Sequence, residues 1–314
     1  MRHAPMDCKL FSIFRCLTIF LACYISGAPY TLADSIDVRR NILQDKLKLL
    51  SYAPGNDYYP IPISINTKYY SGAGSTQLLV ISEIPYTAFK AFLSQDKWCD
   101  ALILQIHIKA CIQKSARILD VYLGSNDYAE PEDVFRFEYT LTKQTIHANY
   151  LYIAMSAQEG PLFSRDYRIS LEIVPTADGK SLLNFELSAY FGFFTRAAIQ
   201  AYLLTIGRNK VGFSILATDK VGQPVFQKGT KGILERNAMR YLLAFFAYLE
   251  VNPDQERDKQ WLDKSLRRWH HYTEVFREQL YEIDLEAYLV QKKAEYQNQL
   301  DLLNGVKKEE WPGD

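Results

Sequence analysis

Hydrophobic and polar side chains alternate along much of the chain between residues 103 and 191. The clearest alternation covers residues 134–141 and 167–173, in which every second residue is apolar. Strands that bury one face and expose the other show this period of two. Because the connections are too short for crossovers, we expect an antiparallel meander. Six strands are predicted, at residues 103–112, 116–124, 134–142, 145–157, 167–174 and 181–191.

The segments before these strands predict a helix, a hairpin and a second, shorter helix. Apolar residues at helical spacing indicate a helix at residues 36–50. Two extended segments, 61–70 and 76–82, flank a glycine-containing stretch that is typical of a hairpin turn. A short helix is predicted after Pro85. Between the later strands, turn-forming residues lie at 125–127, 142–144, 160–161 and 176–180.

Two helices are predicted after the last strand. The first begins at Phe193, ends at Ile206 and carries almost no charge. If it is exposed, we expect a membrane or partner contact, and if it is covered it is part of the core. The second, at residues 230–251, is apolar on more than one side, so it must be largely covered. A connection rich in glycine and lysine, residues 207–229, joins the two helices.

The C-terminal segment, residues 254–304, contains neither glycine nor proline and is dense in mixed charge, which predicts a long helix or a helical pair. Apolar residues recur in it at alternating steps of four and three, as in a coiled-coil seam. Such a stripe can pack against another copy of the chain, against a second helix or along the preceding domain. Its positions are Leu262, Leu266, Trp269, Thr273, Phe276, Leu280, Ile283, Ala287, Val290 and Ala294.

Composition narrows the class of protein. The 314 residues include 36 Lys or Arg and 36 Asp or Glu, so the formal net charge is zero. This balance argues against a nucleic-acid binder that relies on an overall basic surface. Because 48% of the residues are apolar, the chain can bury a large core. We therefore expect a globular protein of one large domain or two small ones.

The first 33 residues have the order of a secretory signal peptide, with positive charges, a short apolar run and small residues before a cleavage point after Ala33. The uninterrupted apolar run, residues 16–25, is too short to span a bilayer, which takes about 20 residues. Acylation of Cys23 in a lipoprotein and an uncleaved membrane anchor are the alternatives. The rest of the chain has no Asn-X-Ser/Thr acceptor, which favours a periplasmic or secreted bacterial protein.

Removal of the signal peptide would leave two cysteines, Cys99 and Cys111. An even number of cysteines in an exported chain allows a disulfide in an oxidising compartment, and two buried free thiols are the alternative. Neither cysteine has histidine or cysteine neighbours at metal-ligand spacing, so no metal site is expected.

The order of the predicted elements resembles the helix-grip fold of the START-like (SRPBCC) lipid-binding superfamily. Residues 98–100, 207–213 and 235–241 are also similar to segments of uncharacterised exported bacterial members. The resemblance covers residues 34–252 and leaves 253–314 as a charged helical extension. It implies an α+β fold in which a curved antiparallel sheet wraps a long helix. It also implies a hydrophobic cavity that binds or transfers a lipid, sterol or polyketide-like ligand.

Two arginines and several tyrosines are candidate ligand-binding residues. Arg236 and Arg240 lie one turn apart on the same face of an otherwise apolar helix, where one of them could bind an anionic head group. The alternative is an ion pair with Glu235 or with a sheet carboxylate such as Glu172 or Glu186. The tyrosines expected to line the cavity are Tyr139, Tyr152, Tyr167, Tyr190 and Tyr241.

No motif for catalysis or cofactor binding is found. The serines lack a Gly-X-Ser-X-Gly context, and an acidic loop at residues 127–133 does not match the spacing of a calcium loop. No cofactor is therefore expected, and an enzyme is the least supported class. We expect an exported binding or transfer protein for a hydrophobic ligand. The alternative is a non-catalytic interaction protein with a filled core and a partner-docking C-terminal helix.

Overall fold

The computed structural model describes residues 32–50, 58–94, 97–252, 254 and 258–305. The chain forms two compact units, residues 1–42 and residues 43–314. Helix α2 (Leu32–Leu50) runs across the boundary between them. All the described strands, and the helices after α2, belong to the second unit. The predicted signal peptide lies outside the described residues except for its last two positions.

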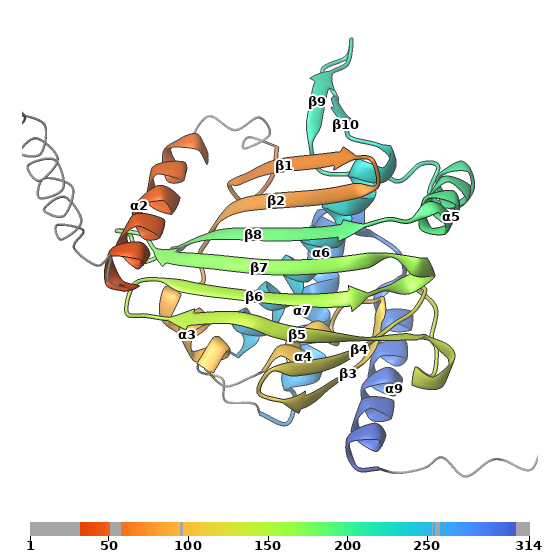
Figure 1. Cartoon of the computed structure of the whole chain (residues 1–314). Helices are drawn as coiled ribbons and strands as arrows, with labels where there is room; N and C mark the ends of the chain where they lie inside the picture. Colours follow the sequence, from red (N-terminus) through yellow and green to blue (C-terminus); the bar gives the residue numbers. More distant parts are fainter. Residues whose placement is uncertain (1–31, 51–57, 95–96, 253, 255–257, 306–314) are drawn as a thin grey trace, which may run out of the picture. The chain divides into compact units, whose positions relative to one another are not determined.

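An eight-stranded antiparallel sheet forms the centre of the second unit (Figure 1). Its spatial order is β1-β2-β8-β7-β6-β5-β4-β3, and each strand pairs antiparallel with its neighbours. The six consecutive strands that the alternation predicts are all present and pair as a meander. The strands are β1 (Ile63–Tyr70), β2 (Ala73–Ser82), β3 (Ile108–Ser115), β4 (Ile118–Leu123), β5 (Phe135–Ile146), β6 (Leu151–Glu159), β7 (Arg165–Pro175) and β8 (Ser181–Tyr190).

Two strand boundaries differ from the prediction. Residues 103–107 are not a strand but a turn that follows α4 (Trp98–Leu102), because a short apolar run is equally compatible with either buried structure. The turn between β5 and β6 lies at residues 147–150 rather than at 142–144. Lys143 and Gln144 instead continue the pairing with β6, and their polar side chains are accommodated because they are exposed.

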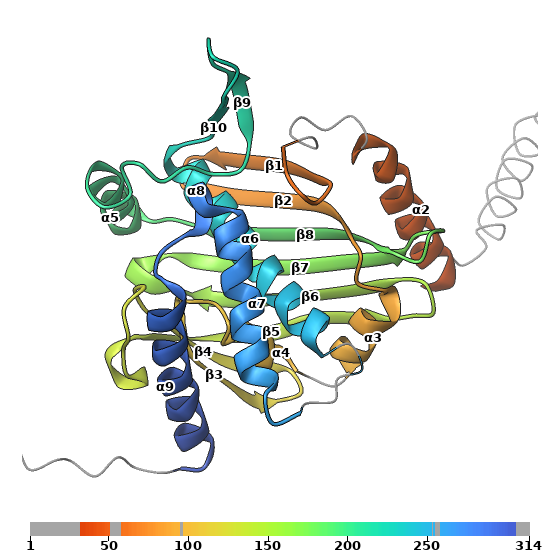
Figure 2. The ribbon, with the colours of Figure 1, turned by 180° about the vertical axis from the view of Figure 1, so that it is seen from behind.

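The helices gather on one face of the sheet, as Figure 2 shows for α6 (Gly229–Val251), α7 (Trp261–Val275) and α9 (Leu285–Leu303). Helix α6 is almost entirely buried, in agreement with its apolar composition. A curved antiparallel sheet that packs on a long helix is the α+β helix-grip arrangement, so the predicted fold class is confirmed. The remaining helices of this unit are α3 (Tyr86–Ser94), α5 (Phe193–Leu204), α8 (Arg277–Leu280) and the 3-10 turns η1 (Pro131–Asp133) and η2 (Pro161–Phe163).

The connection between α5 and α6 contains a hairpin that the sequence analysis did not predict. Strands β9 (Ile215–Thr218) and β10 (Pro224–Phe226) pair antiparallel and project away from the sheet (Figure 1). The hairpin was missed because its strands are only four and three residues long. Its side chains Leu216 and Val221 are exposed.

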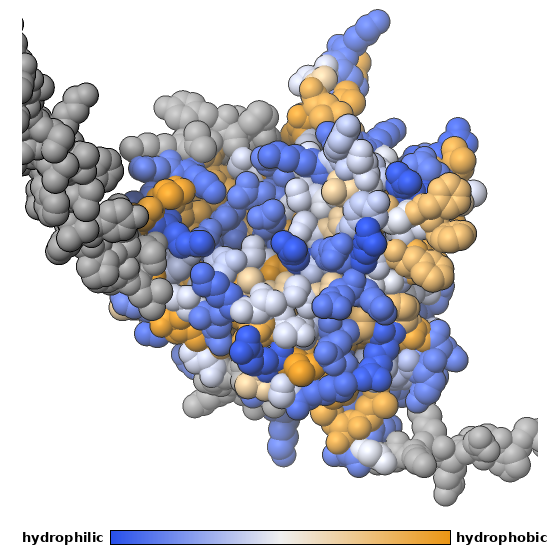
Figure 3. All heavy atoms as spheres, in the orientation of Figure 1, coloured by the Kyte–Doolittle hydropathy of each residue, from blue (hydrophilic) through white to orange (hydrophobic). Residues whose placement is uncertain are grey.

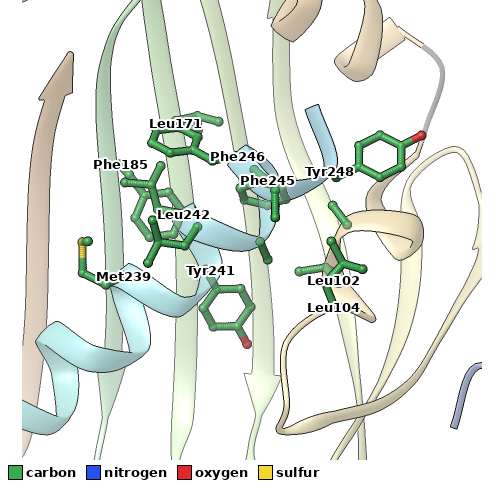
Figure 4. Packing of buried hydrophobic residues seen from close by; sticks show 14 of the residues in the cluster. Leu102, Leu104, Leu171, Phe185, Met239, Tyr241, Leu242, Phe245, Phe246 and Tyr248 are labelled. Carbon is green, nitrogen blue, oxygen red and sulfur yellow. The ribbon is translucent and has the colours of Figure 1, made fainter. Parts of the chain in front are cut away.

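Apolar side chains fill the space between the sheet and α6. Figure 4 shows Leu242 and Phe246 of α6 close to Phe185 and Leu171 of the sheet. Each of these side chains is at most 3% exposed. Burial of one such side chain contributes roughly 1.5–3 kcal/mol, so this layer is the main source of stability in the second unit.

The C-terminal extension folds back on the helix-grip domain. Helix α7 packs against α6, and α9 packs along β3, an edge strand of the sheet. The predicted heptad stripe is wrong beyond Ile283, because Ala287 and Val290 are exposed. The short helix α8 and the turn after it change the direction of the chain, so α9 buries a different face.

The disulfide between Cys99 and Cys111 is present, with the two Cα atoms 5.0 Å apart. It joins α4 to β3 and closes a loop of 12 residues. The prediction of one disulfide from the two remaining cysteines is confirmed. Within the described part of the chain, no helix is long and apolar enough to cross a membrane.

Candidate functional site

Three of the predicted ligand-binding tyrosines meet inside the domain, near η2. Tyr139 comes from β5, Tyr167 from β7 and Tyr241 from α6. The hydroxyls of Tyr139 and Tyr241 lie close enough to interact with each other. Burial raises the pKa of Tyr241 to about 12 and raises that of Tyr139 as well. Both phenols therefore stay protonated at neutral pH and act as neutral donors and acceptors.

Tyr152 and Tyr190 do not line the space between the sheet and α6, which corrects the prediction. Both lie on the outer face of the sheet, since their strand neighbours Leu151 and Ala189 are buried while the two tyrosines are only half-buried. Tyr152 lies under the ammonium group of Lys143, and Tyr190 lies under a guanidinium group. The period of two within each strand already separated the two faces, so this error was avoidable from the sequence.

Arg236 is a buried cation that lies beneath α5. Its guanidinium donates to the carbonyl oxygen of Val211 at 3.1 Å and lies 3.5 Å from the hydroxyl of Tyr202, a residue of α5. Only 2% of the side chain is exposed. Within the described residues it forms no ion pair, and its Nε atom has no hydrogen-bond partner. Burial lowers the pKa of Arg236, because water no longer solvates the charge.

Arg240 is paired, unlike Arg236. Its guanidinium lies 2.6 Å from a carboxylate oxygen of Glu282, and Lys210 contacts the other oxygen of Glu282 at 3.1 Å. The ion-pair alternative therefore describes Arg240, although the carboxylate comes from the C-terminal extension rather than from the sheet. Glu235 does not pair with either arginine, since it accepts hydrogen bonds from the backbone amides of Phe213 and Ser214.

The hollows at the surface of the domain lie away from the space between the sheet and α6. One hollow of about 700 Å³ is on the outer face, where Arg136, Glu138 and Thr140 of β5 line it. Another, of about 660 Å³, is lined by residues that include Arg117 and Gln144. Because buried side chains such as Leu242, Phe246 and Phe185 pack between the sheet and α6, a ligand that enters this layer has to displace some of them.

An exposed apolar patch lies at the η2 end of the domain, next to the tyrosine cluster. The residues that define this η2–α5 patch are Leu162, Phe163, Phe193 and Phe194, with exposed fractions of 57%, 77%, 72% and 64%. Figure 3 shows an apolar area at this position. The hydrophobic pattern of the sequence predicts α5, whereas Leu162 and Phe163 were not predicted as part of an exposed surface. Two large apolar residues directly after Gly160-Pro161, in a turn, were the available signal.

The backbone of η2 is strained. Leu162 and Phe163 have φ angles of 55° and 62°, in the left-handed region that bulky residues rarely adopt. Hydrogen bonds hold this conformation, from the Ser164 hydroxyl to the Pro161 carbonyl and from the Thr195 hydroxyl to the Leu162 carbonyl. Ser164 also contacts the hydroxyl of Tyr167 at 2.9 Å, so η2 is connected directly to the tyrosine cluster. Such strain costs of the order of 1–3 kcal/mol per residue.

A second group of buried charges belongs to the packing of α9 rather than to this site. Lys109 of β3 and Lys292 of α9 both pair with Glu295, and all three side chains are fully buried. Burial lowers the pKa of the nearby His107 to about 3, so this imidazole is neutral. Within the described residues, no group of three His, Cys, Asp or Glu side chains could hold a metal ion.

Comparison with known proteins identifies similar structures but no family. No family model and no curated protein matches the sequence. Among solved structures, the chain is similar to human STARD10, with 8% identity and a TM-score of 0.33 over 71% of this chain and 87% of that one. It is also similar to the human StarD13 lipid transfer and protein localization domain, with 10% identity and a TM-score of 0.29 over 50% and 88% of the two chains. The chain is similar to Ara h 8.0201 as well, with 9% identity and a TM-score of 0.30 over 43% of this chain and 92% of that one.

At TM-scores of 0.28 to 0.33 the likeness carries no argument about ligand or activity.

Proposed function

We propose that the protein binds a hydrophobic ligand of the lipid or sterol type, between the sheet and α6, and stores or transfers it without covalent catalysis. The observation that carries this proposal is the hydroxyl pair of Tyr139 and Tyr241, which lies in an otherwise apolar region and is linked to the η2–α5 patch through Tyr167 and Ser164. A ligand with a single polar group can replace one partner of this pair and place its tail among apolar side chains.

Because the interior is packed with side chains, a ligand has to gain enough free energy on binding to rearrange them. Side chains such as Met239 and Leu242 have to move, and methionine is suited to this because its thioether chain is flexible and adaptable. Each buried methylene of a tail gains about 0.8 kcal/mol, which offsets the cost of rearrangement only when the tail is long. We therefore expect affinity to rise with tail length.

An acidic head group is expected to contact Arg236 rather than Arg240. Arg240 already has a carboxylate partner in Glu282, whereas Arg236 has only neutral partners within hydrogen-bond distance. A guanidinium without a carboxylate partner gains more from a bound carboxylate or phosphate than one that is already paired. This asymmetry distinguishes two arginines that the sequence treats as equivalent.

A second candidate function is that of a non-catalytic interaction protein, and the filled space between the sheet and α6 favours it. In this case the apolar layer is only a core. The C-terminal helix is less suited to the partner-docking role, since α9 packs along β3 of its own domain.

Export is part of the proposal. The supporting observations are the order of charges and apolar residues in the first 33 residues and the disulfide, which persists in oxidising compartments. We propose a periplasmic or secreted location. N-terminal sequencing of the isolated protein should start at Asp34, while an acylated Cys23 at the N-terminus would contradict cleavage after Ala33.

Mass spectrometry of organic extracts from natively purified protein tests ligand binding. We expect an apolar molecule in stoichiometric amount, and titration with fatty acids of increasing length should show increasing affinity. Arg236→Met should weaken the binding of acids relative to the corresponding alcohols, and the matched control Arg240→Met should not. If extracts are empty and no tail length binds, the interaction-protein candidate replaces the proposal.

A further inference from the structure

The η2–α5 patch combines two segments that are 30 residues apart in the sequence. The rings of Phe163 and Phe194 have centroids 5.6 Å apart, and Phe193 lies at the same distance from Phe194. The hydroxyl of Thr195 donates to the carbonyl oxygen of Leu162 at 2.7 Å. Since Thr195 is the only buried residue of α5, the rest of this helix is at least partly accessible to solvent. The patch is therefore an organised apolar surface that the domain itself does not cover.

The charged side chains of α5 and of the chain segments directly before and after it are all positive. Residues 187–218 include Arg196, Arg208 and Lys210 and no acidic residue. Lys210 contacts Glu282, but within the described residues Arg196 and Arg208 form no ion pair, and both are exposed. Near η2 there are two acidic residues, Glu159, which lies opposite Arg165 in the pairing of β6 with β7, and Asp166, whose carboxylate is 3.5 Å from the Arg165 guanidinium. The exposed rings thus share α5 with the exposed guanidinium of Arg196, and the exposed guanidinium of Arg208 follows the end of the helix.

We propose that the η2–α5 patch docks on an anionic lipid bilayer. Aromatic and leucine side chains insert at the boundary between head groups and acyl chains, while arginines contact the lipid phosphates. A bilayer suits this surface better than a protein groove, because α5 is exposed around most of its circumference and the rings of Phe193 and Phe194 are largely exposed. The strained backbone at Leu162 and Phe163 fits the same role, since it keeps two apolar side chains in solvent at a cost in stability.

The proposal extends the proposed function but does not depend on it. A bilayer can be bound by a protein with a filled core, and a ligand can be bound by a protein that never contacts a bilayer. Extraction of a ligand and binding to vesicles are therefore separate measurements, and either can fail alone.

Co-sedimentation of the full chain with vesicles tests the proposal. The probes are vesicles of phosphatidylcholine alone and vesicles with equal parts of phosphatidylglycerol and phosphatidylcholine. We expect binding to the anionic vesicles that weakens with salt. Phe193→Ser and Phe194→Ser should each reduce the affinity roughly tenfold, because each removes a large apolar group from the interface. Arg196→Gln and Arg208→Gln should each reduce it roughly fivefold, on anionic vesicles only.

The matched control replaces apolar residues with comparable exposure at a different site. Leu216 and Val221 of the hairpin are 60% and 78% exposed, so Leu216→Ser and Val221→Ser should leave vesicle binding unchanged. Equal melting temperatures of all the variants show that binding, not folding, has changed. The proposal is overturned if the wild type binds neither kind of vesicle or if the phenylalanine variants bind as well as the wild type. It is also overturned if those variants convert a dimer to a monomer in light scattering, because a second copy then covers the patch.

Discussion

Two regions of the molecule place residues against the usual rule. The contact between α9 and β3 buries charged side chains, and the η2–α5 patch exposes apolar ones. In the first, two lysines and a glutamate are completely buried. In the second, four large apolar side chains are more than half exposed. Charged groups belong in water and apolar groups in the core, so each region has a cost that something else must offset.

In the α9–β3 contact, complete hydrogen bonding provides the offset. The ammonium of Lys109 donates to the carbonyl oxygens of Ile106 and Asp127 and to Glu295, at 2.7–2.9 Å. The ammonium of Lys292 has three acceptors as well, two carbonyl oxygens and the other oxygen of Glu295. Each ammonium has three donors, so both are saturated within the fold.

The η2–α5 patch has no such internal offset. Its phenylalanine rings are covered only in part, by one another, and the backbone is strained at Leu162 and Phe163. The buried charges therefore fix α9 in one position, while the exposed rings are free for a partner outside the chain. Changes in the first region should therefore alter stability, and changes in the second should alter binding.

Removal of the central carboxylate is expected to have the largest effect. Glu295→Ala leaves Lys109 and Lys292 without a counter-charge in a buried environment, which should lower the free energy of unfolding by about 3–5 kcal/mol. Chemical denaturation measures this value. Glu286→Ala, an exposed position on the same helix, is the control and should change it by less than about 0.5 kcal/mol. A loss below about 1 kcal/mol for Glu295→Ala would contradict a saturated buried network.

Reduction of the disulfide should have the next largest effect. Cys99 and Cys111 close a loop of 12 residues, and the backbone amide of Cys111 also donates to Gln299 of α9 at 2.8 Å. Opening the bond should lower the free energy of unfolding by roughly 3 kcal/mol through the larger entropy of the unfolded chain. Denaturation with and without a reductant tests this, and the double variant Cys99→Ser/Cys111→Ser should show no response to the reductant.

Stability should rise with pH above about 8. Burial lowers the pKa of Lys292 to about 8, despite the opposing effect of Glu295, so in the folded state this lysine loses its proton well below the unfolded-state value. Between about pH 8 and 10 the unfolded state binds more protons, and the free energy of unfolding should increase by roughly 2 kcal/mol. Above about pH 10 the raised pKa of Tyr288 acts in the opposite direction.

The variant Lys292→Met isolates this contribution. It removes the titrating group and leaves Lys109 paired with Glu295, so most of the rise between about pH 8 and 10 should disappear. Urea denaturation at several pH values gives both curves. If the free energy of unfolding of Lys292→Met rises as steeply with pH as that of the wild type, a group other than Lys292 causes the rise.

A smaller gain in stability is expected from relief of strain in the η2–α5 patch. Leu162→Gly places glycine at a φ angle of 55°, which glycine adopts without steric cost, and the free energy of unfolding should rise by about 1 kcal/mol. Leu162→Ala removes the same exposed side chain but keeps the strain, so it should not stabilise the protein. Equal stability of the two variants would show that η2 stores no strain.

The smallest effect on stability is predicted for Phe194→Ser. The ring is 64% exposed, so its loss should change the free energy of unfolding by less than about 0.5 kcal/mol. Phe246→Ala, in the layer between α6 and the sheet, should cost about 3–5 kcal/mol. Thermal and chemical denaturation compare the two. A large loss for Phe194→Ser would place this ring in the core of the domain.

Local patterns in the sequence specify most elements of the helix-grip domain. Alternation along residues 167–173 specifies a strand with one buried face, and the continuous apolar surface of residues 230–251 specifies a covered helix, because both patterns are local. The two cysteines left after the predicted signal peptide allowed a disulfide between Cys99 and Cys111, with two free thiols as the alternative, and the structure contains the disulfide. Short connections then restricted the sheet to antiparallel neighbours.

Which polar groups meet depends on how distant elements pack in the fold. Lys292 and Glu295 are typical of an exposed helical face, and nothing local indicates that β3 supplies Lys109 from 183 positions away. For the same reason Arg236 and Arg240 were indistinguishable until the turn after α8 brought Glu282 to one of them. Pairing energies depend on distances of a few ångström between residues far apart in the chain, and no periodicity encodes those distances.

The exposure of α5 was also decided in three dimensions. An apolar helix with almost no charge is compatible with a core or with an exposed surface, since hydrophobicity alone does not state whether another element covers it. The fold leaves α5 uncovered and holds Phe163 beside Phe194, across 31 positions of sequence. The patch is thus a property of the packing of whole elements, which the order of residues within each element does not contain.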